Sequence, residues 1–264
     1  MKNTIAEHNK PRQSGAKLRL NGNMNQLAKI EAPSVRREVT ISSAKPKSFE
    51  ETESLFEHFA WFYIFCREHV FRDDTNRMIK ALWPQRAPDP GAQMIELGCG
   101  PGFYSSRLAA RFPNISVLGV DQSARQLRRA TEKARLLGLG NCYFESVDVL
   151  DLSQADSSFD ILIASRLFTV LSERENAVSE IFRVLKNGGR CFIAEPRYAV
   201  WASIPLFAMW LLAKITRFKN GYREPAYATV LPAREFENLF KTQPWKRVKA
   251  WQDGRYQYAL CEKG

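Results

Sequence analysis

The sequence predicts a doubly wound α/β fold, in which helices cover both faces of a mostly parallel sheet. From residue 94 onward, short apolar runs alternate with amphipathic segments of helical period, which is the pattern of repeated βα units. Residues 159–165 (FDILIAS) are almost continuously apolar, as is typical of a strand buried on both faces of a parallel sheet. Three closely spaced glycines, Gly98, Gly100 and Gly102, follow the first apolar run. In this fold class such a loop lies at the carboxyl edge of the sheet, where ligands bind.

A basic leader precedes the fold. Residues 1–50 carry ten Lys or Arg against four Glu, which accounts for six of the chain's net charge of +11. Residues 1–48 contain no Trp, Tyr or Phe, so they cannot bury enough apolar surface to offset their ordering entropy, and we predict that they are disordered. They also lack the apolar stretch of a secretory signal. Either a solvated tail or a segment that contacts nucleic acid, membrane or a partner fits this composition.

The aromatic segment that follows predicts helices in front of the sheet. Residues 54–71 place apolar and aromatic side chains on neighbouring helical stripes, which predicts one helix with a wide apolar face. Residues 72–84 predict a second helix, with Asp74 or Thr75 as the N-cap and Pro84 as the stop. Residues 85–93 are rich in proline and predict a loop.

The remaining pattern gives the order of strands and helices. The predicted strands are residues 94–97, 115–120, 142–149, 159–165 and 190–196. The predicted helices between them are residues 106–112, 124–138 and 173–185, the last stopped by Asn187-Gly188-Gly189.

The spacing of the glycines argues against a dinucleotide site. A dinucleotide fingerprint needs GxGxxG, whose third glycine lets the helix pack closely on the strand. Here that position is Phe103, and the glycine comes one residue earlier, at Gly102. Pro101 also removes a backbone N–H that would otherwise face a pyrophosphate.

The stretch IELGCGPGF resembles motif I of the class I S-adenosylmethionine-dependent methyltransferases, and the chain is similar to their small-molecule, ubiquinone-biosynthesis-like branch. The resemblance continues in the family's order through residues 117–123 (VLGVDQS), 146–152 (SVDVLDL), 157–165 (SSFDILIAS) and 180–196 (EIFRVLKNGGRCFIAEP). It implies a seven-stranded sheet whose last strand is antiparallel. Residues 245–264 are then expected to supply the final two strands as a hairpin around Asp253-Gly254.

The resemblance implies S-adenosylmethionine as cofactor, with S-adenosylhomocysteine as product, and it assigns roles to the glycine loop. The backbone of Gly98, Cys99, Gly100 and Gly102 is implied to pack against the methionine part of the cofactor, where a Cβ would collide. Glu96 is implied to meet the cofactor's ammonium group through water.

The resemblance assigns further contacts along the next strands. Asp121 is implied to accept the ribose hydroxyls, because an ionised carboxylate serves two donors, with Gln122 extending that wall. Asp148 is implied to accept from the adenine amino group, with Val149 beside it. Two residues that leave the fourth strand are implied to lie near the methyl donor: Ser165 and Arg166.

The acceptor site is less defined by the sequence. Thr169 stands where many relatives have a histidine, so no general base or other catalytic residue is assigned. Residues 198–213 are almost wholly apolar, which fits a buried lid over an apolar pocket, an interfacial membrane contact or a membrane span. We predict that four residues line the acceptor pocket: His58, Tyr63, Phe168 and Trp201.

The cysteines and histidines predict no metal site. The five cysteines are scattered and form no CxxC pair, which favours free thiols in a reducing compartment. His58 and His69 lie eleven residues apart, or roughly 16 Å along a helix. They are therefore too far apart to bind one ion.

The sequence therefore predicts a cytoplasmic methyltransferase that acts on a small apolar or aromatic acceptor, with peripheral membrane contact through residues 198–213 as an alternative. The predicted domain is residues 49–264, with residues 49–84 as a helical lid and 197–230 as an apolar lid insertion. An RNA or protein methyltransferase using the basic leader is an alternative, although a nucleic-acid partner is disfavoured by the lack of a separate RNA-binding motif. A non-catalytic cofactor-binding scaffold is another. The sequence indicates no oligomeric state.

Overall fold

The computed structural model describes residues 54–84, 87–216 and 227–264. All of them belong to the unit Ser48–Gly264, one of two into which the chain divides. The predicted leader, residues 1–48, lies outside the described residues. So do residues 217–226 of the predicted lid insertion.

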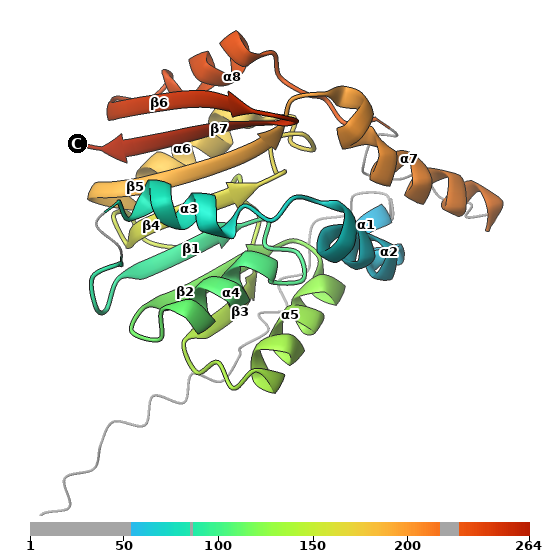
Figure 1. Ribbon diagram of the computed structural model, residues 1–264, viewed down its shortest axis with the longest axis horizontal. Coiled ribbons are helices and arrows are strands. Elements are labelled where there is room, and N and C mark those ends of the chain that lie inside the picture. The colour runs from blue at the N-terminus through green and yellow to red at the C-terminus, as the bar shows by residue number, and fades with distance from the viewer. Residues whose placement is uncertain (1–53, 85–86, 217–226) are drawn as a thin grey trace, which may run out of the picture. The chain divides into compact units, whose positions relative to one another are not determined.

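A single seven-stranded sheet forms the centre of this unit, in the order β3-β2-β1-β4-β5-β7-β6 (Figure 1). Strands β1 to β5 pair in parallel, while β7 runs antiparallel to both β5 and β6. The predicted fold class and the C-terminal hairpin around Asp253-Gly254 are confirmed. The strands are β1 Gln93–Leu97, β2 Ser116–Asp121, β3 Cys142–Ser146, β4 Phe159–Ser165, β5 Leu185–Pro196, β6 Trp245–Asp253 and β7 Tyr256–Lys263.

Helices cover both faces of the sheet, because alternate side chains of each strand point to opposite faces. Ile95 and Leu162 pack with α6 (Arg174–Val184) and α8 (Ala233–Phe240) in one apolar cluster. Met94 and Ile163 pack with helices of the other face in a second cluster. Those helices are α3 Thr75–Leu82, α4 Phe103–Arg111 and α5 Ala124–Leu136.

The aromatic segment 54–71 is not the single helix that the sequence predicts. It consists of α1 (Leu55–His58), α2 (Ala60–Phe65) and a short π-helix, η1 (Cys66–Val70). The break falls at Phe59, whose backbone leaves the helical region. It lets Leu55 and Phe59 pack in one cluster, while Tyr63 lies against the glycine loop.

Other element boundaries differ from the predicted ones by a few residues. Asp74 occupies the N-cap position of α3, as predicted, but its side chain makes no capping hydrogen bond. Asp73 instead accepts from the backbone N–H of Thr75 at 2.9 Å. Helix α4 begins at Phe103, three residues earlier than predicted, and the sequence analysis did not predict α8.

Helix α7 (Ala199–Ile215) packs beside α1 in a third apolar cluster. This cluster contains Leu206 and Met209 of α7 together with Leu55 and Phe59 of the aromatic segment. The predicted apolar lids at 54–71 and 198–213 therefore meet each other. Within the described residues, no helix has the length and apolar character needed to cross a membrane.

Candidate functional site

A cavity of about 250 Å³ opens where the carboxyl ends of β1, β2 and β4 meet the aromatic segment. Its wall gathers residues from segments that are far apart in the sequence. Eight of the residues singled out from the sequence line it: Tyr63, Gly98, Gly100, Asp121, Gln122, Val149, Ser165 and Arg166. The cavity therefore lies at the edge of the sheet that the glycine loop predicts.

The three glycines of the loop all have positive φ, at 65°, 51° and 70° for Gly98, Gly100 and Gly102. A Cβ on Gly100 would lie 3.4 Å from the Tyr63 ring. A Cβ on Gly102 would lie 2.8 Å from the Phe144 ring and 2.9 Å from Ala130. Gly102 thus permits close packing of α4 inside the protein, and it does not line the cavity.

The side chain of Cys99 does not face the cavity. It is buried, and its sulfur lies 2.9 Å from where a Cβ on Gly119 would be, so the side chain points into the protein. Cys99 does not line the cavity.

Asp121 ties the glycine loop to the end of β2. Its Oδ2 accepts from the backbone N–H of Gly100 and its Oδ1 from that of Ser123, both at 2.8 Å. Burial raises the pKa of the Asp121 carboxyl, against the opposing effect of these two hydrogen bonds. Each carboxylate oxygen has a second lone pair, so the group can still accept from a ligand in the cavity.

Glu96 is turned away from the cavity. It is buried and accepts hydrogen bonds from the backbone N–H and the hydroxyl of Ser105, in the first turn of α4. Burial raises the pKa of the Glu96 carboxyl to about 7, although both bonds from Ser105 lower it. The side chain therefore anchors α4 behind the loop and is not among the cavity-lining residues.

Arg67 is a candidate that the sequence analysis missed. Its guanidinium group lies 3.6 Å from the centre of the Phe103 ring and 4.4 Å from that of Tyr104, at the start of α4. The side chain is buried, and its Nη1 and Nη2 have no hydrogen-bond partner. A buried cation without a hydrogen-bond partner is unusual, but Arg67 is not among the cavity-lining residues. A lone Arg inside an aromatic segment was the only sequence signal.

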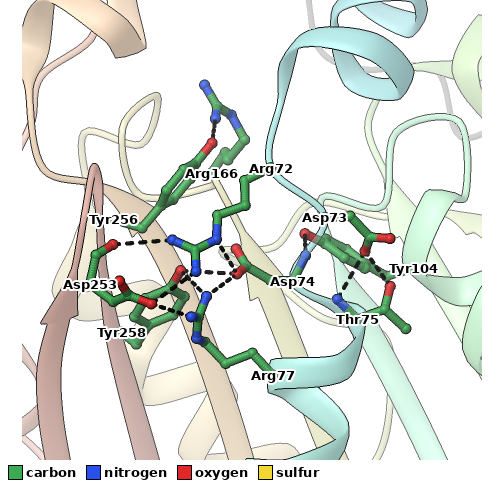
Figure 2. Close-up of polar contacts among 10 residues, drawn as sticks. All are labelled: Arg72, Asp73, Asp74, Thr75, Arg77, Tyr104, Arg166, Asp253, Tyr256 and Tyr258. Atoms are coloured by element: carbon green, nitrogen blue, oxygen red, sulfur yellow. Dashed lines mark hydrogen bonds and ion pairs between the residues drawn. The ribbon is translucent and has the colours of Figure 1, made fainter.

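Arg166 is held rigidly at the end of β4. Its φ of 62° is unusual for a residue other than glycine and marks local backbone strain. The guanidinium lies 3.6 Å from the centre of the Phe71 ring. Its Nη1 donates to the hydroxyl of Tyr256 at 2.7 Å (Figure 2). The side chain lines the cavity beside Ser165.

A cluster of charged groups connects α3 to the C-terminal hairpin behind Arg166 (Figure 2). Buried Asp74 accepts from Arg77 at 2.7 Å and from the hydroxyl of Tyr258 at 2.9 Å. Arg72 and Arg77 both pair with Asp253, at the hairpin turn. The cluster fixes the hairpin that carries Tyr256, and through Tyr256 it positions Arg166.

Glu195 holds the loop that follows β4, and the sequence analysis did not single it out. Its Oε1 accepts from the backbone N–H groups of Leu167 at 2.8 Å and Phe168 at 3.0 Å. Burial raises the pKa of the Glu195 carboxyl to about 7. The acid in residues 194–196 (AEP), at the end of the fifth strand, was the available signal.

Asp148, which the resemblance assigns to the adenine amino group, is not among the cavity-lining residues. Asp148 is exposed, and its side chain accepts from the N–H of Leu150 at 2.9 Å in a local turn. Its neighbour Val149 does line the cavity.

Three of the four predicted acceptor residues do not line the cavity; only Tyr63 does. Phe168 is buried in the core against Phe240, because the loop after β4 turns it inward. Trp201 is exposed on α7 beneath Arg255. The ring of His58 packs edge-on against Phe59.

The chain matches a known family over most of its folded part. Residues 88–252 match a family described as a methyltransferase domain. The chain belongs to this family. The match begins just before β1 and ends in β6, so it contains the glycine loop, Asp121 and Arg166.

Two relatives and one solved structure illustrate the likeness. The chain is 34% identical over 131 residues to trans-aconitate 2-methyltransferase of Deinococcus radiodurans, covering 48% of this chain and 47% of that protein. It is 28% identical over 185 residues to 2-methyl-6-phytyl-1,4-hydroquinone methyltransferase 1, chloroplastic, of Oryza sativa subsp. japonica, covering 65% and 53%. The chain thus spans about half the length of the curated relatives it matches. The fold resembles that of a SAM-dependent methyltransferase of Methanosarcina mazei with a TM-score of 0.51 and 24% identity, covering 68% of this chain and 96% of that one.

Proposed function

We propose that this chain is an S-adenosylmethionine-dependent methyltransferase that acts on a small organic acceptor. The observation that carries the proposal is Asp121, a carboxylate in the cavity wall bonded to the backbone of the glycine loop. This arrangement places a carboxylate that can accept hydrogen bonds from two hydroxyl groups beside a glycine backbone that a cofactor can approach closely. Membership of the methyltransferase family supports the same function.

The residues present fit the cofactor. Asp121 would accept the ribose hydroxyls, with Gln122 beside it, and Val149 offers an apolar surface to the adenine. When bound, the cofactor supplies a sulfonium that already activates the methyl group for direct displacement.

The rest of the cavity supports a mainly apolar acceptor. Phe56, Val170 and Leu171 line it together with the Tyr63 ring. Arg166 adds one fixed cation to this wall and would orient a polar or anionic group of the acceptor. Such a wall supports catalysis by orienting the acceptor and excluding water, without a general base.

The proposal includes the predicted organisation of the chain. The segments 49–84 and 197–230 would act as lids of a domain spanning residues 49–264, which fits the contact between α1 and α7. A lipophilic acceptor dissolves in lipid rather than in water, so the proposal also includes peripheral contact with a membrane.

Calorimetry and methyl transfer test the proposal. We expect the protein to bind S-adenosylhomocysteine and not NAD, and to transfer a labelled methyl group to members of a panel of carboxylic acids, phenols and hydroquinones. Binding of NAD in place of S-adenosylhomocysteine would refute the cofactor assignment. Transfer only to tRNA or peptide in the same panel would refute the small-molecule assignment.

A further inference from the structure

Helix α7 has two apolar faces. Within the described residues, one face packs in an apolar cluster, and the other is exposed apart from the stacking of Phe207 on Tyr227. Ala202, Leu206, Met209 and Ala213 form the buried face, which packs in the cluster around Leu55. The opposite face is also apolar. It consists of Val200, Ile204, Phe207, Leu211 and Ile215, which we call the α7 stripe, and all five are exposed.

The α7 stripe is continuous along the helix. Its members recur at intervals of three or four residues, which places them in one row on the helix surface. The row is roughly 22 Å long at 1.5 Å rise per residue. Val200 and Ile215 at its two ends are 72% and 68% exposed. A row of large aliphatic and aromatic side chains at this exposure indicates a contact surface rather than scattered surface residues.

Cations and aromatic rings frame the stripe at both ends. Arg255 lies 3.8 Å from the centre of the Trp201 ring, and Lys214 lies 5.3 Å from that of Trp210. Arg197 lies 5.3 Å from the Tyr198 ring centre. Among the ion pairs of the described residues, none involves these three cations.

This chemistry selects one occupant. Residues 197–219 contain no Asp or Glu, so the surface offers an apolar row with unpaired positive charge around it. A second copy of the same face would bring like charges together, which disfavours a symmetric dimer. A bilayer with anionic headgroups satisfies both features, because aliphatic side chains enter the acyl boundary while cations and aromatic rings stay at the headgroups.

We propose that the α7 stripe is a docking surface for an anionic lipid bilayer, on which α7 lies flat. The stripe faces away from the core, and α7 packs on α1. Phe56 of α1 and Tyr63 of α2 line the cavity. The bilayer would therefore meet the protein at the lid beside the cavity. The α7 stripe would be the surface through which the membrane contact in the proposed function is made. This docking rests on the proposed function only for the identity of the methyl acceptor.

Vesicle co-sedimentation of the full chain tests the surface. The probes are vesicles of phosphatidylcholine alone and of phosphatidylcholine with phosphatidylglycerol. We expect binding to the anionic vesicles to exceed binding to the neutral ones by about tenfold or more, because each cation near an anionic surface adds about a fivefold factor. The double variant Ile204→Asp, Leu211→Asp should lower that binding by at least about tenfold, since it removes apolar area and adds negative charge.

A matched control separates the stripe from general charge effects. Leu136 and Leu137 are exposed apolar residues on the distant helix α5 and its C-cap. The variant Leu136→Asp, Leu137→Asp makes the same change of charge, removes at least as much exposed apolar area and keeps the basic leader. We expect this control to bind vesicles like the unaltered protein. Equal loss in both variants, or no preference for anionic vesicles, would overturn the proposal.

Two further measurements on these proteins distinguish lipid docking from dimerisation and from a wrong cofactor assignment. A solution dimer that the stripe variant dissociates would assign the face to a second copy and overturn lipid docking. S-adenosylhomocysteine affinity should be the same in all three proteins, because neither pair of substitutions touches the cavity. If none of the three proteins binds S-adenosylhomocysteine, while the unaltered protein and the control still bind vesicles, the proposed cofactor is refuted and the docking surface is supported.

Discussion

Two acids beside the glycine loop, half-buried Asp121 and buried Glu96, have different positions relative to the cavity. Both follow the pattern of the family's motifs, and both accept backbone hydrogen bonds. Asp121 reaches the cavity wall, whereas Glu96 is closed off against Ser105. Sequence alone could not distinguish them, because each acid ends or nearly ends a strand. The difference depends on which way the side chain points.

The role of Asp121 can be tested by replacing it with alanine. We expect Asp121→Ala to lower the affinity for S-adenosylhomocysteine, because two charge-assisted hydrogen bonds to the ribose are lost, on the order of 1.5–3 kcal/mol each before compensation. Calorimetry measures the change. The control Glu132→Gln removes an exposed acid on α5 that pairs with Arg135. Unchanged affinity in Asp121→Ala would remove this residue from the binding site.

The two carboxyls with raised pKa predict an unusual pH dependence of stability. Glu96 and Glu195 titrate at about 7 in the folded protein, against 4.5 for an ordinary glutamate. Between these values the folded state keeps protons that the unfolded chain has released, so the free energy of unfolding falls as the pH rises from about 4.5 to about 7. The loss is about 3 kcal/mol for each group.

Urea denaturation at pH 5 and pH 8 measures this effect. Glu195→Gln keeps an oxygen that accepts from the N–H groups of Leu167 and Phe168, but it cannot ionise. We expect the variant to lose less stability than the unaltered protein between the two pH values. A stability that rises over this range, or an identical slope in the variant, would contradict the prediction.

At the scale of elements, Gly102 decides how closely α4 packs. Its φ is 70°, and its Cα lies so close to Phe144 and Ala130 that there is no room for a Cβ. We expect Gly102→Ala to destabilise the protein by about 2–5 kcal/mol, the sum of left-handed strain and overpacking. Its thermal midpoint should fall by about 5–15 °C.

Gly138 provides a control with the same backbone conformation. Its φ is 67°, but nothing lies within 4 Å of where a Cβ would be. Gly138→Ala should therefore cost only the left-handed strain, about 1–2 kcal/mol. Differential scanning calorimetry compares the two. Equal midpoints would show that packing at Gly102 contributes nothing.

The sequence predicted the elements that carry periodic apolar patterns and failed where neighbours decide the conformation. The strands of the parallel sheet are predictable because burial on both faces leaves long apolar runs, as in residues 159–165. The break at Phe59 was not, because residues 54–71 contain no Gly or Pro to mark it and their apolar face is wide. In α7, apolar residues lie on both faces, so the sequence did not show which face is buried. Trp201 was therefore assigned to a pocket that it does not line.

At the scale of the whole molecule, the acceptor wall depends on contacts between distant segments. Arg166 is fixed by Tyr256, 90 residues further along the chain. The hairpin that carries Tyr256 is in turn fixed by Arg72, 181 residues before Asp253. No local pattern encodes such pairs, which is why the sequence analysis found Arg166 but neither its partners nor Arg67.

The basic leader provides the prediction that concerns the chain as a whole. Residues 1–45 contain no Trp, Tyr or Phe, and about a third of them are apolar against 45% of the whole chain, so we expect them to add little to the core of the folded unit. We expect deletion of residues 1–45 to leave folding and S-adenosylhomocysteine affinity intact, because the residues proposed to hold the cofactor, Asp121, Gln122 and Val149, lie outside the deleted segment. Thermal unfolding measures the first and calorimetry the second.

The deletion should change only what the charge of the leader affects. It removes cations from the chain, so binding to anionic vesicles should weaken and its dependence on salt should lessen, while the contribution of the α7 stripe stays. A thermal midpoint lowered by more than about 5 °C, which corresponds to roughly 1–2 kcal/mol for a unit of this size, would show that the leader packs on the folded unit. In that case its role is structural as well as electrostatic, and the predicted domain boundary at residue 49 is wrong.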